Sequence, residues 1–329
     1  MTRFDYTITL EGFDSLSSCW LKPRSRLQWD CIFVLPPWLE TWWRELGPSS
    51  NPYLGAVKRK GTIIGIAPLV LKGKEACFIG SADVCDCLDF VVRTGSEWDF
   101  FNSLLDDLRQ KGIRRLYLGP LRPESTVLSH FVSIADERGY EVSCEAEDVS
   151  LELDLPRTWE EYLEILNQKQ RHEVRRKLRR LREAGEVNYR VIEASEAVPD
   201  AIELFLRFFR ESRQDKETFL TGKRESFLRS LAKATAQAQL LRMGILELDT
   251  QPVAAVMCFD YDDAVYLYNS GYDPQYRSLS VGLISKILCI KDGIERGRGR
   301  FDFLKGAEQY KYRLGGKEIP LQACTVVLR

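Results

Sequence analysis

Residues 300–315 read RFDFLKGAEQYKYRLG, and this stretch has polar residues where packing alone would not place them. Asp302 stands between two phenylalanines in a run too short and too apolar for a surface loop, which predicts a half-buried strand near a sheet edge or a cleft. Lys305, Tyr310 and Lys311 follow at once, in a basic turn or short helix. An aspartate, two lysines and a phenol just past a strand end are the groups that a site for proton transfer or for an anionic ligand requires.

A second polar segment, residues 277–282 (RSLSVG), lies between a predicted strand end and a predicted helix at 281–296. Small residues there let backbone N–H groups approach a pyrophosphate, and the helix N-terminus adds favourable partial charge. Arg277 can supply a counter-ion. Ser280 also fits a plain N-cap, so the residues alone leave a phosphate site and a helix cap as alternatives.

The two segments together resemble a known family. The pattern Asp-Phe-Leu-x-Gly-x-Glu-x-Tyr-Lys-x-Arg-Leu-Gly, preceded by residues 268–274 (YNSGYDP) and by the Ser280-x-Gly282 helix start, resembles the C-terminal half of the FemAB-like, CelD-type acyltransferases of the GNAT superfamily. The resemblance runs from about Trp159 to the C-terminus. Residues 86–92 (DCLDFVV) resemble a strand of the first domain of these proteins.

This resemblance implies an N-acyltransferase that moves an acyl group from acyl-coenzyme A, with acetyl-coenzyme A the first candidate, to an amine in a ternary complex. The acceptor would be a small-molecule amine, an amino sugar or another polysaccharide or cell-envelope precursor, and no metal is expected. Tyr310 would protonate the leaving thiolate, and Asp302 would orient the amine or accept its proton. In the family's coenzyme A loop, Ser280 replaces the first glycine.

The remaining candidate residues fall into two groups by their expected ligand. Those expected to bind coenzyme A or to face its thioester are Asn269, Ser270, Gly271, Arg277, Ser280, Val281 and Gly282. Those expected to bind the acceptor are Asp86, Asp89, Lys305 and Lys311. For the two acceptor aspartates, a turn aspartate followed by a hydrogen-bonded strand-edge aspartate is an equally good interpretation.

The chain of 329 residues is long for one core and predicts two domains, residues 1–148 and 149–329. Residues 111–119 (KGIRRLYLG) and 296–306 (RGRGRFDFLKG) both contain a helix end at glycine, basic residues and a short apolar strand. This repetition indicates two tandem GNAT-like domains of mixed α/β (α+β) class, each a largely antiparallel twisted sheet flanked by helices. Tyr117 takes the place of Asp302 in the first copy, which is therefore predicted to have lost the chemistry.

The element order of the second half is the basis of the GNAT assignment. A Thr158 capping box opens a helical stretch to Ala184, followed by a strand, two helices, three antiparallel strands, a helix and a strand. The predicted strands lie at 53–57, 62–70, 76–79, 88–92, 115–118, 141–144, 150–155, 187–192, 240–248, 253–259, 264–271, 301–304 and 325–328. The other predicted helices lie at 97–111, 123–138, 197–211, 224–237 and 281–296.

Charge is spread unevenly along the chain, although its net value is −1. Residues 1–150 contain 17 basic and 21 acidic side chains, which leaves 30 and 27 beyond, so the second half is the better place for an anion site. The basic run from Lys169 to Arg182 predicts either an amphipathic helix with a solvated face or an anion-binding surface. Aminoacyl-tRNA, as used by peptidoglycan-bridge members of the FemAB group, would suit the second alternative. A non-catalytic binding protein on a duplicated fold is the third functional hypothesis.

Cysteines and apolar runs bear on the compartment. Nine cysteines without CxxC spacing favour reduced thiols, and with two histidines they do not predict a zinc site. The N-terminus shows no apolar leader, and the longest apolar run, residues 62–71, is far shorter than the ~20 residues that span a bilayer. A cytoplasmic protein is therefore expected. The absence of Gly-x-Ser-x-Gly argues against a hydrolase.

Overall fold

The computed structural model describes residues 6–22, 26–49, 51–212 and 218–328. Its contacts divide the chain into two compact units, Met1–Val149 with Ile319–Arg329, and Ser150–Glu318. The strands β7 (Glu141–Asp154) and β13 (Lys317–Val327) each run from one unit into the other, so the predicted boundary near residue 148 falls inside a strand. The C-terminal strand, predicted with the second domain, pairs instead with β6 (Arg115–Leu121) of the first unit.

The first unit has a sheet with strand order β1-β2-β3-β4-β6-β13, and β5 pairs with β3. All neighbours are antiparallel except β4 and β6, which are parallel from Glu75–Arg115 to Cys77–Tyr117. The remaining strands are β1 (Tyr6–Leu10), β2 (Tyr53–Arg59), β3 (Thr62–Lys72), β4 (Glu75–Phe78) and β5 (Val91–Val92). The helices are α1 (Phe13–Trp20), η1 (Ile32–Val34), α2 (Pro36–Leu46), α3 (Glu97–Gln110), η2 (Val127–Phe131) and α4 (Val132–Glu137).

An aromatic cluster forms part of the core of the first unit, with ring centroids 4.8 to 6.0 Å apart. Its members are Phe78, Phe90, Phe100, Phe101 and Phe131. The sequence did not predict the elements before Tyr53, and the strand predicted at 88–92 is reduced to Val91–Val92. Asp89, next to Phe90, is hydrogen-bonded to Thr126 at the start of η2, which holds this segment as a loop.

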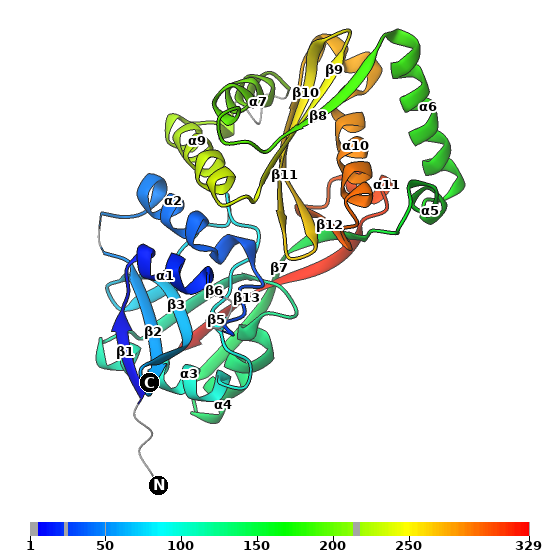
Figure 1. Cartoon of the computed structure of the whole chain (residues 1–329). Coiled ribbons are helices and arrows are strands. Elements are labelled where there is room, and N and C mark those ends of the chain that lie inside the picture. Colours follow the sequence, from blue (N-terminus) through cyan, green and yellow to red (C-terminus); the bar gives the residue numbers. More distant parts are fainter. Residues whose placement is uncertain (1–5, 23–25, 50, 213–217, 329) are drawn as a thin grey trace. The chain divides into compact units, whose positions relative to one another are not determined.

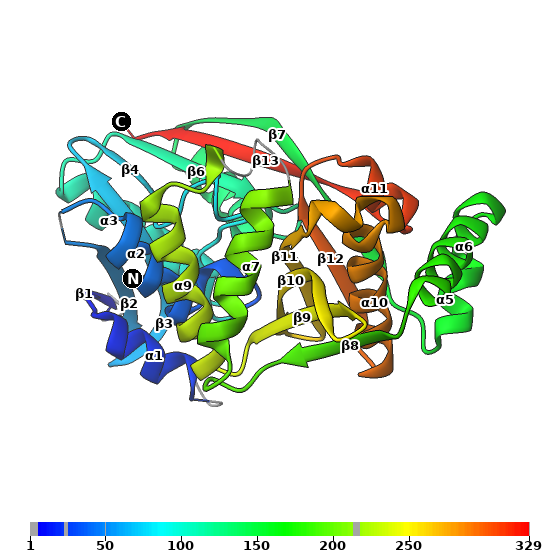
Figure 2. The same ribbon diagram turned by 90° about the horizontal axis from the view of Figure 1, so that it is seen from above.

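The second unit repeats this arrangement with strand order β8-β9-β10-β11-β12-β7 and one parallel pair, β11 with β12. The helices α7 and α9 cover one face of its sheet, and α10 and α6 lie on the other (Figures 1 and 2). The strands are β8 (Val187–Ile192), β9 (Leu241–Leu248), β10 (Gln251–Tyr261), β11 (Ala264–Tyr272) and β12 (Arg300–Lys305). The helices are α5 (Trp159–Ile165), α6 (Gln168–Ala184), α7 (Val198–Ser212), α9 (Gly222–Gln237), η3 (Pro274–Leu279), α10 (Val281–Glu295) and α11 (Gln309–Arg313).

The matching strand orders, each with a single parallel pair, confirm the two tandem GNAT-like domains of mixed α/β class. One local prediction was wrong, because the helical stretch from Thr158 to Ala184 is two helices. Asn167 starts a second capping box, in which its side chain accepts the Gln170 N–H and the Gln170 side chain accepts the Asn167 N–H, both at 2.9 Å. A new helix begins there, because the capping box satisfies the N–H groups of Asn167 and Gln170 at its first turn.

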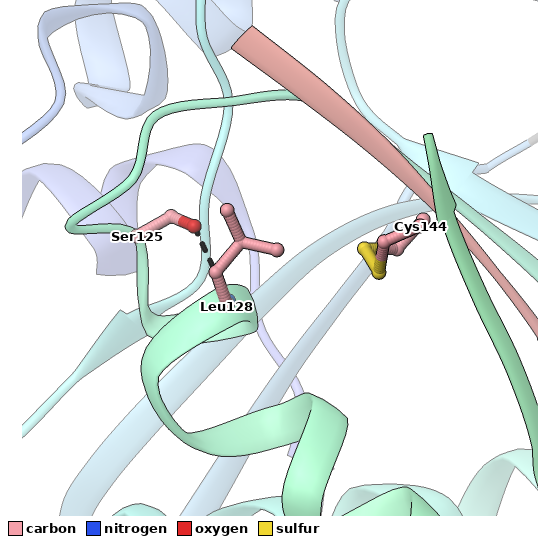
Figure 3. The surroundings of a disulfide bond; sticks show 4 residues. Ser125, Leu128 and Cys144 are labelled. Atoms are coloured by element: carbon pink, nitrogen blue, oxygen red, sulfur yellow. Dashed lines mark hydrogen bonds between the residues drawn. A yellow bond between two sulfur atoms is a disulfide. The ribbon is translucent and has the colours of Figure 1, made fainter. Parts of the chain in front are cut away.

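A disulfide bond joins Cys144 in β7 to Cys324 in β13, with their Cα atoms 4.1 Å apart (Figure 3). The prediction of reduced thiols throughout is therefore wrong for this pair, while the other seven cysteines, all among the described residues, form no disulfide bond. The pair is separated by 180 residues in sequence, so no local spacing indicates it. Within the described ranges, no helix is long and apolar enough to cross a membrane.

Candidate active site

The parallel pairing of β11 with β12 ends halfway along both strands. It covers three residue pairs, from Ala264–Arg300 to Tyr266–Asp302. Just beyond, β11 contains a β-bulge against β10, because Met257 faces Asn269 while Cys258 faces Leu267 and Tyr268 is the extra residue. Bulges next to active sites redirect a strand and end its pairing. The second half of β11 is therefore the place in this sheet where a ligand could take the position of a neighbouring strand.

Asp302 secures the end of β12 at this point. Its carboxylate Oδ1 accepts the N–H of Leu304 at 2.7 Å and the hydroxyl of Ser150 at 3.2 Å, and its side chain is 1% exposed. Leu304 has φ = 63°, a left-handed conformation that costs a non-glycine residue about 1–2 kcal/mol. The buried carboxylate thus holds the backbone at a β12 bulge, in which Phe303 is the extra residue between Asp302 and Leu304. The role of Asp302 in orienting the amine stays a prediction.

Lys311 is also buried, with 2% of its surface exposed. Its Nζ donates to the carbonyl oxygens of Leu304 at 2.8 Å, Lys305 at 2.6 Å and Gly306 at 3.0 Å, and it pairs with Glu308 at 2.8 Å. These contacts occupy the ammonium group and tie α11 to the end of β12. Binding of an anionic acceptor by Lys311 stays a prediction, and the side chain of Lys305 is partly exposed at the strand end.

Tyr310 lies beside the start of α10 and is partly exposed. Its ring packs edge-on to Phe303 with the centroids 6.5 Å apart, and the Nζ of Lys286 lies 5.0 Å from its centroid. Lys286 also donates to the carbonyl of Gly282 at 2.7 Å. The structure thus brings the predicted acid next to the predicted coenzyme A loop. Sequence reasoning missed Lys286, although its position one helical turn after Gly282 is the available signal.

The loop before α10 has the backbone conformation that a glycine would favour. Ser280 has φ = 60° and ψ = 31°, and its side chain makes no capping hydrogen bond to α10. Its Oγ instead accepts a hydrogen bond from Nζ of Lys177 in α6 at 2.7 Å. This left-handed conformation explains why the family pattern has glycine at the position of Ser280. Lys177 adds a cation that the sequence did not assign to this loop.

Packing constrains the glycines on either side of this loop. A Cβ on Gly271 would lie 2.3 Å from the backbone nitrogen of Phe209 in α7, and one on Gly282 would lie 2.6 Å from the Tyr272 ring. Both glycines thus serve close packing inside the unit. Ser270 is 8% exposed, whereas Arg277 is exposed and Val281 is buried. Asn269 stands next to the β11 bulge.

Asp86 and Asp89 belong to the first unit. The Asp89 carboxylate accepts the N–H of Thr126 at 2.7 Å, the hydroxyl of Thr126 at 2.6 Å and the N–H of Phe90 at 2.8 Å. Burial raises the pKa of Asp89 to about 6, although these hydrogen bonds act in the opposite direction. Its contacts are those of a residue that anchors the loop, which fits the hydrogen-bonded alternative, and its assignment to the acceptor stays a prediction. Asp86 is partly exposed in the same loop.

Comparison with known proteins identifies the second unit. A family model described as the acetyltransferase (GNAT) domain matches residues 168–312. Residues 168–312 therefore form a GNAT domain. This match begins at α6 and ends in α11, so it contains the β11 bulge, the Ser280 loop and Tyr310. No curated protein matches the chain.

Solved structures show the same fold over the length of the chain. FemX is 11% identical, with 97% of this chain and 96% of that chain covered and a TM-score of 0.67. A conserved protein of unknown function from Bacteroides thetaiotaomicron is 13% identical, with 98% and 99% covered and a TM-score of 0.63. L-PGS from Bacillus licheniformis is 13% identical, with 87% and 90% covered and a TM-score of 0.53. At these identities the likeness is one of fold.

Proposed function

We propose that this GNAT protein is an N-acyltransferase that takes the acyl group of an acyl-coenzyme A, with acetyl-coenzyme A the first candidate. The amine nitrogen attacks the thioester carbonyl, so that a C–N bond forms and the C–S bond breaks. The ammonium group must lose one proton to solvent before attack and a second one as the amide forms, and the leaving thiolate gains one proton. The observation that carries this proposal is the end of β11–β12 pairing next to the Ser280 loop, within the GNAT domain.

The residues around the Ser280 loop fit a pyrophosphate. The left-handed Ser280 starts a helix of 15 residues, whose first N–H groups and partial charge favour an anion. Lys177 and the exposed Arg277 supply two cations at the same place. The backbone of Asn269–Gly271, at the open part of β11, would supply the N–H donor for the tetrahedral oxyanion.

Tyr310 is the proposed acid for the leaving thiolate. Its phenol has a higher ordinary pKa than a thiol, so the transfer needs a well-placed hydrogen bond more than an altered pKa. The ammonium of Lys286 over its ring places positive charge where a thiolate would form. Asp302 and Lys311 act in this proposal only by fixing the end of β12, on which α11 and Tyr310 depend.

The acceptor is proposed to be an amine of small-molecule size, with amino sugars and polysaccharide or cell-envelope precursors as candidates from the CelD-type resemblance. Coenzyme A thioesters are metabolites of the cytoplasm, and we place the reaction there. The Cys144–Cys324 disulfide makes this compartment testable, since thiols in a cytoplasmic protein are ordinarily kept reduced.

The donor assignment is tested by titrating coenzyme A into the full chain in a calorimeter. Ser280→Gly keeps the left-handed conformation and should bind coenzyme A as the wild type does. Ser280→Val should bind about tenfold more weakly, because a β-branched residue is strongly disfavoured at φ = 60°. Absence of wild-type binding, or equal affinity of the two variants, would refute the donor site. Binding without acyl transfer to any amine would favour the non-catalytic hypothesis.

An aminoacyl-tRNA-dependent transfer is the second candidate, favoured by the exposed basic face of α6. Leu178 and Leu181 of α6 pack in one cluster with Val281 and Ile284 of α10. The acidic residues of α6 are Glu173 and Glu183. The exposed basic residues of α6 are Lys169, Arg175, Arg179, Arg180 and Arg182.

Salt dependence separates this candidate from the first. If α6 binds tRNA, affinity should fall steeply between 50 and 200 mM salt, about 10³-fold or more for six phosphate contacts. Replacing Arg175, Arg176, Arg179 and Arg180 by glutamine should then remove most of that dependence. If tRNA binding is weak and insensitive to this change, while transfer from acetyl-coenzyme A is retained, the tRNA-dependent function is excluded.

A further inference from the structure

A surface groove of about 710 Å³ lies at the end of the second unit's sheet where β11 finishes. It lies between the C-terminal half of α7, the start of β10 and the beginning of η3. Its volume is in the range of small-molecule sites, which is roughly 300–1,000 Å³. Its lining residues are Arg207, Glu211, Gln251, Pro252, Asp273, Pro274, Gln275 and Tyr276.

The α7 wall of the groove and the Ser280 loop lie on different sides of β11. Gly271 is directly against the α7 backbone, whereas the ring of the next residue, Tyr272, lies against Gly282 of α10. Successive strand residues point to opposite faces, so α7 and its wall of the groove are on one face of the sheet and the coenzyme A loop is on the other. Figure 2 shows α7 and α10 on opposite sides of the sheet. A two-substrate transferase requires separate approaches for donor and acceptor, and the groove provides the second.

The charges of the groove argue against a phosphate-rich ligand. One guanidinium, Arg207, faces two carboxylates, Glu211 and Asp273, while two glutamines and Tyr276 offer neutral hydrogen-bonding groups. Among the described residues, neither Arg207 nor Glu211 has an ion-pair partner. The Asp273 carboxylate is fixed because it accepts the N–H of Gln275 at 2.9 Å, and the Arg207 guanidinium lies 4.8 Å from the Phe208 ring centroid. Charges of both signs in one groove suit a zwitterion.

We propose that this groove binds the acceptor through an amino acid or short-peptide part, with a carboxylate on Arg207 and an ammonium group facing Glu211 and Asp273. The proposal rests on the acyltransferase function and names its acceptor class. Asp273 is two residues from Gly271, roughly 7 Å along the strand, so an acceptor whose amino acid or peptide part is held in the groove can extend a second amine to the open part of β11. The amides of Gln251 and Gln275 can pair with a peptide group.

The test uses calorimetric titration of the full chain with three probes that differ in charge. L-alanyl-L-alanine carries both charges, its N-acetyl derivative lacks the ammonium group and its C-terminal amide lacks the carboxylate. We expect the dipeptide to bind at least tenfold more tightly than either derivative. Arg207→Gln should weaken dipeptide binding about tenfold and remove the advantage over the amide, and Glu211→Gln should remove the advantage over the N-acetyl form.

Arg210→Gln is the matched control, because Arg210 is on the same helix but pairs with Glu225 outside the groove. It should leave dipeptide affinity unchanged. Equal binding of the three probes, no dipeptide binding, or an unchanged Arg207→Gln affinity would overturn the groove assignment. Coenzyme A titrated into the same samples separates the two proposals, since its binding depends on the Ser280 loop and should survive both groove substitutions.

Discussion

Lys311→Met tests whether the buried ammonium of Lys311 holds the end of β12 or binds a ligand. Methionine keeps the apolar stem and removes the charge that contacts three carbonyl oxygens and Glu308. Leu304 is buried, and its carbonyl oxygen would lose its hydrogen-bond partner, which should lower the free energy of unfolding by about 1–3 kcal/mol. The carbonyls of Lys305 and Gly306 belong to partly exposed residues and would cost less, roughly 0.5 kcal/mol each. We expect a total loss of about 3 kcal/mol.

The assay is differential scanning calorimetry. The transition of the second unit is identified as the one whose Tm rises when coenzyme A is added. A loss of about 3 kcal/mol should lower its Tm by roughly 6–12 °C. Arg313→Met on the same helix is the control, because Arg313 is exposed and its guanidinium contacts the Gln309 side chain, so its Tm should change little. If Lys311→Met melts as the wild type does and binds coenzyme A or acceptor more weakly, Lys311 is a ligand residue and our interpretation is wrong.

Three further predictions address single residues. Burial raises the pKa of Asp89 from 3.8 to about 6, so its contribution to stability is complete below pH 4 and is lost as the pH rises through 6, by up to about 3 kcal/mol. The difference in unfolding free energy between wild type and Asp89→Asn should show this dependence on pH. Parallel curves of unfolding free energy against pH for the two proteins would contradict it. Tyr310→Phe should lower kcat about 10²-fold with coenzyme A affinity and Tm unchanged, and wild-type turnover would end its assignment as the acid. Cys144→Ser should destabilise the first unit by about 2–4 kcal/mol and make its Tm insensitive to dithiothreitol, whereas an unchanged Tm would show that the disulfide constrains nothing.

Much of the second unit's element order could be predicted from the sequence, because its signals are local. The hairpins of β9, β10 and β11 have clear turn residues between their apolar strands. In the first unit, the helix at Glu97–Gln110 has clear helical periodicity. The hairpin turns at Asp249-Thr250 and Asp262-Asp263 have positive φ at all four positions, as two-residue hairpin turns require. Turn chemistry and periodicity act over a few residues, so the sequence states them directly.

What the sequence alone determined about this protein is therefore its GNAT domain, its duplication and the segments that surround the candidate site. The tertiary structure decided which of the polar residues are available for chemistry. The sequence predicts catalysis for Asp302 and acceptor binding for Lys311, and the structure shows both side chains buried and bonded to the backbone around the β12 bulge. Lys177 reaches Ser280 across 103 residues and Cys144 reaches Cys324 across 180, because strand and helix packing bring distant segments together. Availability of a side chain depends on which neighbours fold around it, and residue type and spacing do not contain that information.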